Sequence, residues 1–79
     1  MRIGNFILSQ RFIEERPETA RVIMGHCIVV RCEMMYYSGN FHYTAISPHF
    51  DEVGHGAVPS DYAIRIGTEF ADVKFEREK

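Results

Sequence analysis

From residue 27 onward, hydrophobic and polar side chains alternate with a period of two. In the segment CIVVRCEMMYY the even-numbered positions are apolar, and the two charged residues, Arg31 and Glu33, are odd-numbered. Successive side chains of a β-strand point to opposite faces of a sheet, so the alternation predicts a strand whose even-numbered face packs on the core. The alternation continues in NFHYTAIS, where Phe41, Tyr43 and Ala45 are the apolar positions.

A turn signal separates these two strands. The residues Ser38-Gly39-Asn40 favour a tight turn, and the two flanking segments then form a β-hairpin. A two-residue loop at Ser38-Gly39 places Tyr36 opposite Phe41, so that the apolar faces of both strands coincide. A two-residue loop at Gly39-Asn40 keeps this agreement, whereas a three-residue loop breaks it.

Two further strands are predicted in the C-terminal third. Residues 62–66 alternate with apolar side chains at Tyr62, Ile64 and Ile66, and residues 71–76 form a second alternating segment. The residues Gly67-Thr68-Glu69 between them read as a turn. The charged tail from Glu76 to Lys79 is expected to fray.

The N-terminal segment predicts helix. Ser9 is a suitable N-cap, and residues 9–16 favour a helix with Phe12 and Ile13 on its apolar side. Residues 17–25 fit either a second helix that begins at Pro17 or a chain that leads directly into the strand. The predicted fold is α+β: one or two short N-terminal helices packed on a four-stranded antiparallel sheet, in a single domain spanning residues 1–79.

Composition narrows the classes of function. A chain of 79 residues with 13% aromatic residues can bury a small core, and self-association is one way to add to its stability. The net charge of −2 and the lack of a basic run argue against nucleic-acid binding as the main role. No membrane span or signal peptide is recognisable. Cys27 and Cys32 read as two buried free thiols, which fits a reducing cytoplasm.

Residues 46–62, ISPHFDEVGHGAVPSDY, concentrate potentially reactive side chains in a long loop. A metal site needs three or four ligands at one point, and the six-residue spacing of His49 and His55 matches no common zinc motif. Catalysis needs a nucleophile beside a base, but Cys32 and His42 fall on opposite faces of the hairpin. We therefore expect neither an enzyme nor a bound cofactor or metal.

Apolar residues outside the predicted core indicate binding instead. Met35 and Tyr37 lie on the outer face of the hairpin, and Phe50 and Val53 lie in the loop. The loop residues could equally fold back and pack as a connector. The candidate binding residues are Phe50, Asp51, Glu52, Val53, His55, Met35 and Tyr37.

The run CIVVRCEMMYYSGNFHYTAISPHFDEVGHGAVPSDYAI, residues 27–64, resembles short uncharacterised proteins encoded by bacteriophages and prophages. The resemblance rests on the Arg-Cys-Glu strand, the aromatic turn, YTAIS and FDEV. It implies a small accessory protein that binds a host enzyme or a defence component in the host cytoplasm. It assigns no functional residues.

The sequence thus favours a non-enzymatic interaction module that binds a host or phage protein, or itself as a homodimer. One alternative is a metal- or small-ligand-binding domain that uses the loop at residues 48–61. Its ligands would be His49, Asp51, Glu52 and His55. The other alternative is a weak nucleic-acid binder with four arginines and two stacking rings. These are Arg11, Arg16, Arg21, Arg31, Tyr36 and Tyr37.

Overall fold

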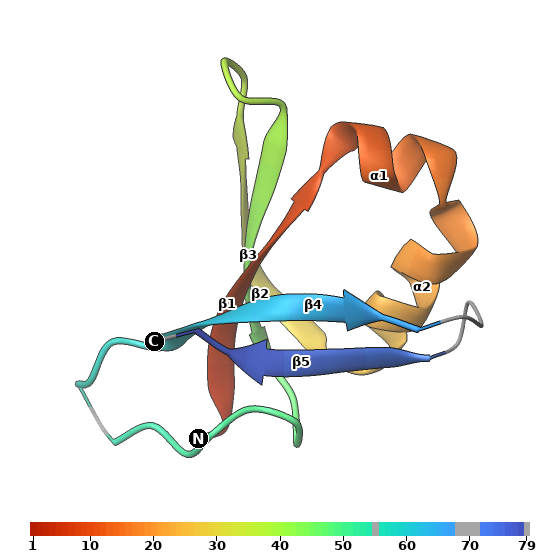
Figure 1. The fold of residues 1–79 in the computed structure, drawn as a ribbon. Helices are drawn as coiled ribbons and strands as arrows, with labels where there is room; N and C mark the ends of the chain where they lie inside the picture. The colour runs from red at the N-terminus through yellow and green to blue at the C-terminus, as the bar shows by residue number, and fades with distance from the viewer. Residues whose placement is uncertain (55, 68–71, 79) are drawn as a thin grey trace.

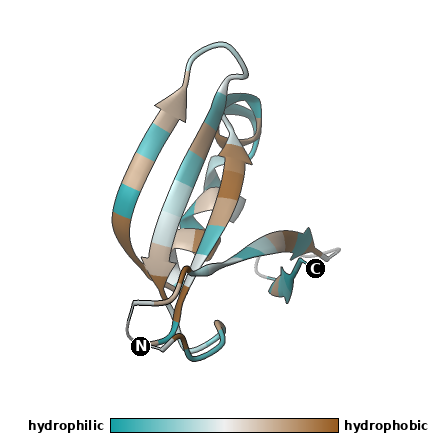
Figure 2. Cartoon of the chain, turned by 90° about the vertical axis from the view of Figure 1, so that its left-hand side faces the viewer, coloured by the Kyte–Doolittle hydropathy of each residue, from teal (hydrophilic) through white to brown (hydrophobic). Residues whose placement is uncertain are grey.

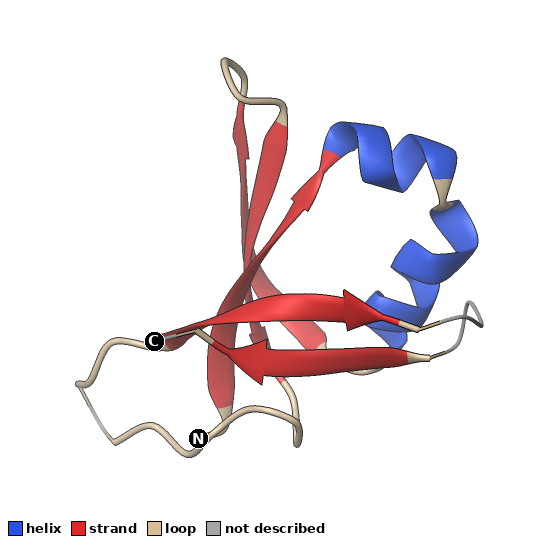
Figure 3. Cartoon of the chain, viewed as in Figure 1, coloured by secondary structure: helices blue, strands red, loops and turns tan. Residues whose placement is uncertain are grey.

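A computed structural model describes residues 1–54, 56–67 and 72–78 of the chain. Two consecutive helices follow the first strand, and four further strands follow the helices (Figures 1 and 3). The elements are β1 (Ile3–Ser9), α1 (Gln10–Glu15), α2 (Pro17–Gly25), β2 (Ile28–Met35), β3 (Asn40–Ile46), β4 (Ser60–Ile66) and β5 (Val73–Arg77).

The five strands form one mixed sheet in the order β2-β3-β1-β4-β5. Strand β1 pairs in parallel with β4 over only two residue pairs, Gly4–Ser60 and Asn5–Asp61, and every other pair of neighbours is antiparallel. The β4–β5 hairpin runs across the direction of β1 and β3, and the two helices lie on one side of the bent sheet (Figure 1). The α+β class is confirmed, but the prediction of four antiparallel strands is wrong.

The sequence prediction missed β1, which lies in the middle of the sheet. Phe6 and Leu8 point into the core, whereas Ile7 points to the other face and is about half exposed. Three consecutive apolar residues hide the period of two, and α1 begins directly after Ser9. The strand and the helix therefore merge into one apolar stretch that reads as helical.

Both helices begin with the expected signals. The Ser9 hydroxyl oxygen accepts a hydrogen bond from the Phe12 backbone N–H at 3.0 Å, which caps α1. Pro17 occupies the first turn of α2, where a missing N–H costs nothing, and Glu18 lies in the same turn. The predicted helix at residues 9–16 is confirmed, and the alternative for residues 17–25 is resolved as helix. Ile23 anchors α2 in the core.

The β2–β3 hairpin has the predicted faces but a longer turn. Met34, and not Tyr36, lies opposite Phe41, so residues 36–39 form a four-residue loop. The Met35 carbonyl oxygen accepts from the Gly39 N–H at 2.9 Å, and Gly39 has a φ of +67°, which glycine adopts without strain. The observed register differs from the predicted one by an even number of residues, so the side chains next to the turn keep their predicted faces.

A β-bulge at Val30 changes the faces at the start of β2. Ile28 lies opposite Ile46 on the outer face, although its even number predicted the core face. Because one extra residue enters the strand, the parity of the side chains before it is reversed. Ile28 is 70% exposed as a result. Cys32 is also exposed, against the prediction, and Cys27 is half-buried.

The C-terminal hairpin has nearly the predicted extent. Strand β4 begins two residues before Tyr62, and β5 begins at Val73, with Ile64 opposite Phe75. Thr68, Glu69 and Ala71 of the predicted turn and strand lie outside the described residues. Within the part that the structure describes, neither helix has the length and apolar run needed to cross a membrane.

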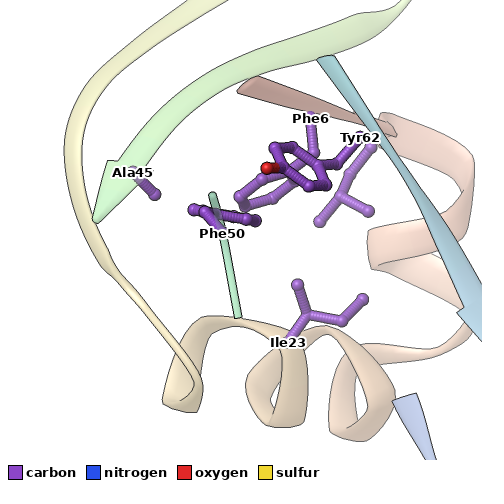
Figure 4. Packing of buried hydrophobic residues seen from close by; sticks show 6 residues of the cluster. Phe6, Ile23, Ala45, Phe50 and Tyr62 are labelled. Carbon is purple, nitrogen blue, oxygen red and sulfur yellow. The ribbon is translucent and has the colours of Figure 1, made fainter. Parts of the chain in front are cut away.

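The core lies between the helices and the inner face of the sheet (Figure 4). The ring centroids of Phe6 and Tyr43 are 5.2 Å apart. Each fully buried apolar side chain stabilises the fold by about 1.5–3 kcal/mol. A Cβ on Gly4 would lie 2.6 Å from Cε1 of Tyr62, so only glycine fits there without movement. The buried apolar residues are Phe6, Leu8, Ala20, Ile23, Ala45, Phe50 and Tyr62.

Candidate interaction surface

Phe50, the first candidate contact residue, is buried in the core. Its side chain is 1% exposed and its ring packs on Phe75 and on Tyr62, with centroids 5.1 Å and 4.6 Å away. The Arg2 guanidinium donates to its carbonyl oxygen at 2.9 Å. Phe50 therefore cannot offer its ring to a partner, and the loop is a packed connector at this residue.

The neighbouring carboxylates point to different partners. Asp51 accepts a hydrogen bond from the Arg77 guanidinium at 3.0 Å, whereas Glu52 pairs with the Met1 amine and lies 3.9 Å from Arg2. The hydrogen bond from the Met1 amine lowers the pKa of the Glu52 carboxyl, and the charge of that amine lowers it further. Each carboxylate thus joins the loop to another segment.

The other loop candidates do not converge on one point. His49 packs its ring against His26, with centroids 5.0 Å apart, and Val53 is half-buried with its N–H donating to the Met1 carbonyl oxygen at 2.9 Å. His55 lies outside the described residues. No group of three or more histidine, cysteine, aspartate or glutamate side chains is placed to hold a metal among the residues that the structure describes.

The exposed hydrophobic residues gather instead on β2 and the turn that follows it. We call residues 28–37 the edge surface. Tyr37, a predicted candidate, is 88% exposed, whereas Met35 is half-buried. Of the eight large hydrophobic residues that are exposed in the described part of the chain, five lie on the edge surface. They are Ile28, Val29, Val30, Tyr36 and Tyr37.

The edge surface is exposed because β2 is the last strand of the sheet. Strand β2 pairs only with β3, and no described element lies beside its other edge (Figure 2). An edge strand carries unpaired backbone N–H and C=O groups along its free side. The strand therefore combines free hydrogen-bonding groups with apolar side chains.

Two charges interrupt the apolar residues of β2. The Arg31 guanidinium pairs with the Glu33 carboxylate on the outer face, and both side chains are more than half exposed. Figure 2 shows hydrophilic bands in the middle of the strand, with hydrophobic segments before and after them. Along β2, apolar residues are therefore followed by a basic residue, an acidic residue and further apolar residues.

A polar cleft of about 440 Å³ lies on the outer face, where β4 leaves β1. The Thr44 hydroxyl donates to Oδ1 of Asn5 at 2.7 Å, and Nδ2 of Asn5 donates to the Pro59 carbonyl oxygen at 3.2 Å and to Asp61 at 3.4 Å. These polar groups satisfy one another and hold β4 against β1. Sequence reasoning missed this network because its members are 39 and 56 residues apart in the chain.

No protein-family model matches the chain, and neither the curated proteins nor the solved structures include a significant match to it.

Proposed function

We propose that the chain is a small protein-interaction module that binds a partner polypeptide along the edge surface. The observation that carries the proposal is the free edge of β2, an eight-residue strand flanked by exposed apolar side chains. A partner strand added to such an edge gains backbone hydrogen bonds, and alternate side chains supply the specificity. Of the candidate residues predicted from the sequence, the proposal keeps Met35 and Tyr37, which lie on the edge surface, and leaves out those of the loop at residues 48–61.

The distribution of charge favours a protein partner over a nucleic acid. Arg31 is paired with Glu33, and Arg11 is paired with Glu15 at 3.1 Å. The chain carries a net charge of −2, which disfavours the phosphate contacts that dominate nucleic-acid affinity. The resemblance of residues 27–64 to phage-encoded proteins adds the hypothesis that the partner is a host or phage protein.

Site-specific photo-crosslinking tests the proposal. A benzophenone side chain replaces Tyr37 in one variant and Val58 in another, since the two positions are almost equally exposed, at 88% and 85%. In living cells, we expect a discrete covalent adduct from position 37 and none of the same mass from position 58. Equal adducts from both positions, or no adduct from either, would contradict the proposal.

A second substitution links the adduct to the free edge. Val30→Lys places a charge on the edge strand at a position that is 53% exposed, and lysine on an edge opposes strand addition. We expect the adduct from position 37 to disappear in this background, while Val58→Lys, an equally drastic change on the loop, leaves it intact. An adduct that survives Val30→Lys would place the contact elsewhere.

A further inference from the structure

We infer that the edge surface binds a second copy of the same chain, with β2 pairing antiparallel to its own copy about a two-fold axis at Cys32. This inference rests on the proposed function and names the partner. Its basis is the order of residues along β2 and their exposure, which together make the strand complementary to itself.

The symmetry restricts the possible registers. Along a strand, the backbone groups of every second residue point to the free edge. Two copies related by a two-fold axis therefore pair odd-numbered residues with odd-numbered ones, and even-numbered residues with even-numbered ones. One residue must then face its own copy. The axis can pass through Arg31, Cys32 or Glu33 in the middle of the strand, and each choice fixes all the other pairs.

The charges distinguish these registers. With the axis at Arg31, two guanidinium groups face each other, and with the axis at Glu33, two carboxylates do so. Like charges directly opposite each other destabilise a strand pair, whereas opposite charges stabilise it. With the axis at Cys32, Arg31 faces Glu33 of the second copy and Glu33 faces its Arg31. This register therefore gives two favourable charge pairs.

The apolar residues agree with the same axis. The apolar residues before the charges, residues 28–30, then lie near the apolar residues after the charges, residues 34–36, of the second copy. Ile28 and Tyr36, at the two ends of this segment, are both exposed. Apolar side chains thus gather at both ends of the charged centre, without residue-by-residue pairing, because the bulge reverses the faces before Arg31.

The β-bulge at Val30 limits the length of this ladder. Regular pairing covers the residues from Arg31 to Glu33, and beyond it the contact consists of side chains. Because the ladder is so short, the dimer also depends on its apolar flanks.

The Cys32 thiol provides a direct test of the register. Directly opposed residues of an antiparallel pair have Cα atoms about 4.5–5.5 Å apart, and a disulfide needs about 4.4–6.8 Å. Mild oxidation should therefore link two chains through the exposed Cys32 and not through Cys27. The Cys32→Ser variant should give no covalent dimer. A cysteine at position 58 in the Cys32→Ser background controls for random collision and should link at least roughly tenfold more slowly, because exposure is the only property that favours it.

Charge reversal gives a test that does not depend on the thiol. Arg31→Glu and Glu33→Arg each place like charges opposite each other, so each variant alone should dimerise at least roughly tenfold more weakly. An equimolar mixture of the two should restore dimers, because a chain with two acidic residues meets a chain with two basic ones. Arg65→Glu, which removes an exposed arginine–glutamate pair between β4 and β5, is the matched control and should leave the dimer intact.

Sedimentation velocity at micromolar to submillimolar concentrations measures the association. A mass twice the 9.2 kDa of one chain, lost in each single variant and recovered in the mixture, supports the assignment. A wild-type protein that stays monomeric, or a mixture that fails to associate, overturns it. If the protein is monomeric but Tyr37 still crosslinks to a protein of another mass, the second copy is rejected while the proposed function stands. If position 37 gives no adduct either, both fail.

Discussion

The ring of Tyr62 packs against the ring of Phe50, with centroids 4.6 Å apart. The Tyr62 hydroxyl oxygen also accepts a hydrogen bond from the backbone N–H of Asp51 at 2.7 Å, so one side chain of β4 holds two consecutive loop residues. The contact explains why a long segment without helix or strand is fixed on the core. It also determines what a substitution at Phe50 must do.

Phe50→Ala is expected to destabilise the fold by about 3–5 kcal/mol, because it leaves a cavity among Phe6, Tyr62 and Phe75. Urea unfolding monitored by circular dichroism measures the change. Tyr37→Ala, which truncates an exposed aromatic residue on the edge surface, should alter stability by no more than about 0.5 kcal/mol. If Phe50→Ala unfolds at the wild-type urea concentration, the placement of Phe50 in the core is incorrect.

Ser47→Ala is expected to cost about 1–3 kcal/mol. The buried Ser47 hydroxyl donates to the His26 carbonyl oxygen at 2.6 Å and accepts from the His49 N–H at 3.2 Å, so its removal leaves two polar groups without their partner. Ser38→Ala serves as the control, because the Ser38 hydroxyl is exposed and donates to the Met35 carbonyl oxygen at 3.3 Å. Equal losses in the two variants would speak against a structural role for Ser47.

The two thiols should react at different rates. Cys32 is exposed, whereas Cys27 is half-buried and its thiol donates to the Ile23 carbonyl oxygen at 3.5 Å. Burial also raises the pKa of the Cys27 thiol, which lowers the fraction of reactive thiolate. With a disulfide reagent at mildly alkaline pH, we expect Cys32 to react at least roughly tenfold faster. In the Cys32→Ser variant, only the slow reaction of Cys27 should remain. In denaturant, the two thiols of the wild-type protein should react at the same rate.

The Glu52 carboxyl should titrate below its ordinary range, because the Met1 amine holds it in the charged form. A pKa that is lower in the folded than in the unfolded state stabilises the fold above the unfolded pKa, and this contribution disappears as the pH falls through the folded pKa. Carbon-detected NMR titration of the Glu52 side chain measures the value. Acetylation of the Met1 amine should move it back toward the ordinary range, and an unchanged titration after acetylation would exclude the amine as the cause.

Sequence patterns predicted the parts of the fold that depend on neighbours in the chain. The Ser9 cap, the Pro17 start of α2 and the alternation of Phe41, Tyr43 and Ala45 are local signals, and the structure confirms each of them. The four-residue turn escaped prediction because Tyr36 and Tyr37 are good strand residues and give no turn signal. The bulge at Val30 likewise has no signature in a run of β-branched residues.

The candidate site was harder to predict because exposure is a property of the whole fold. The apolar residues of β2 read as a core strand, and only the order of strands shows that β2 lies at the edge. The sequence left open whether Phe50 and Val53 form a contact surface or a packed connector, and contacts with Tyr62 and the Met1 backbone fix them in place. The distinction between surface and core therefore depended on pairings between distant segments.

The short parallel seam between β1 and β4 has a consequence for the order of folding. The two hairpins, β2–β3 and β4–β5, join neighbouring segments and can form early, whereas the seam joins Gly4 to Ser60 and Asn5 to Asp61. Closing so long a loop costs chain entropy before two residue pairs can offset it. We expect the C-terminal hairpin to dock last, when Phe50 and Tyr62 meet, so that the rate of folding is set by the association of two preformed halves.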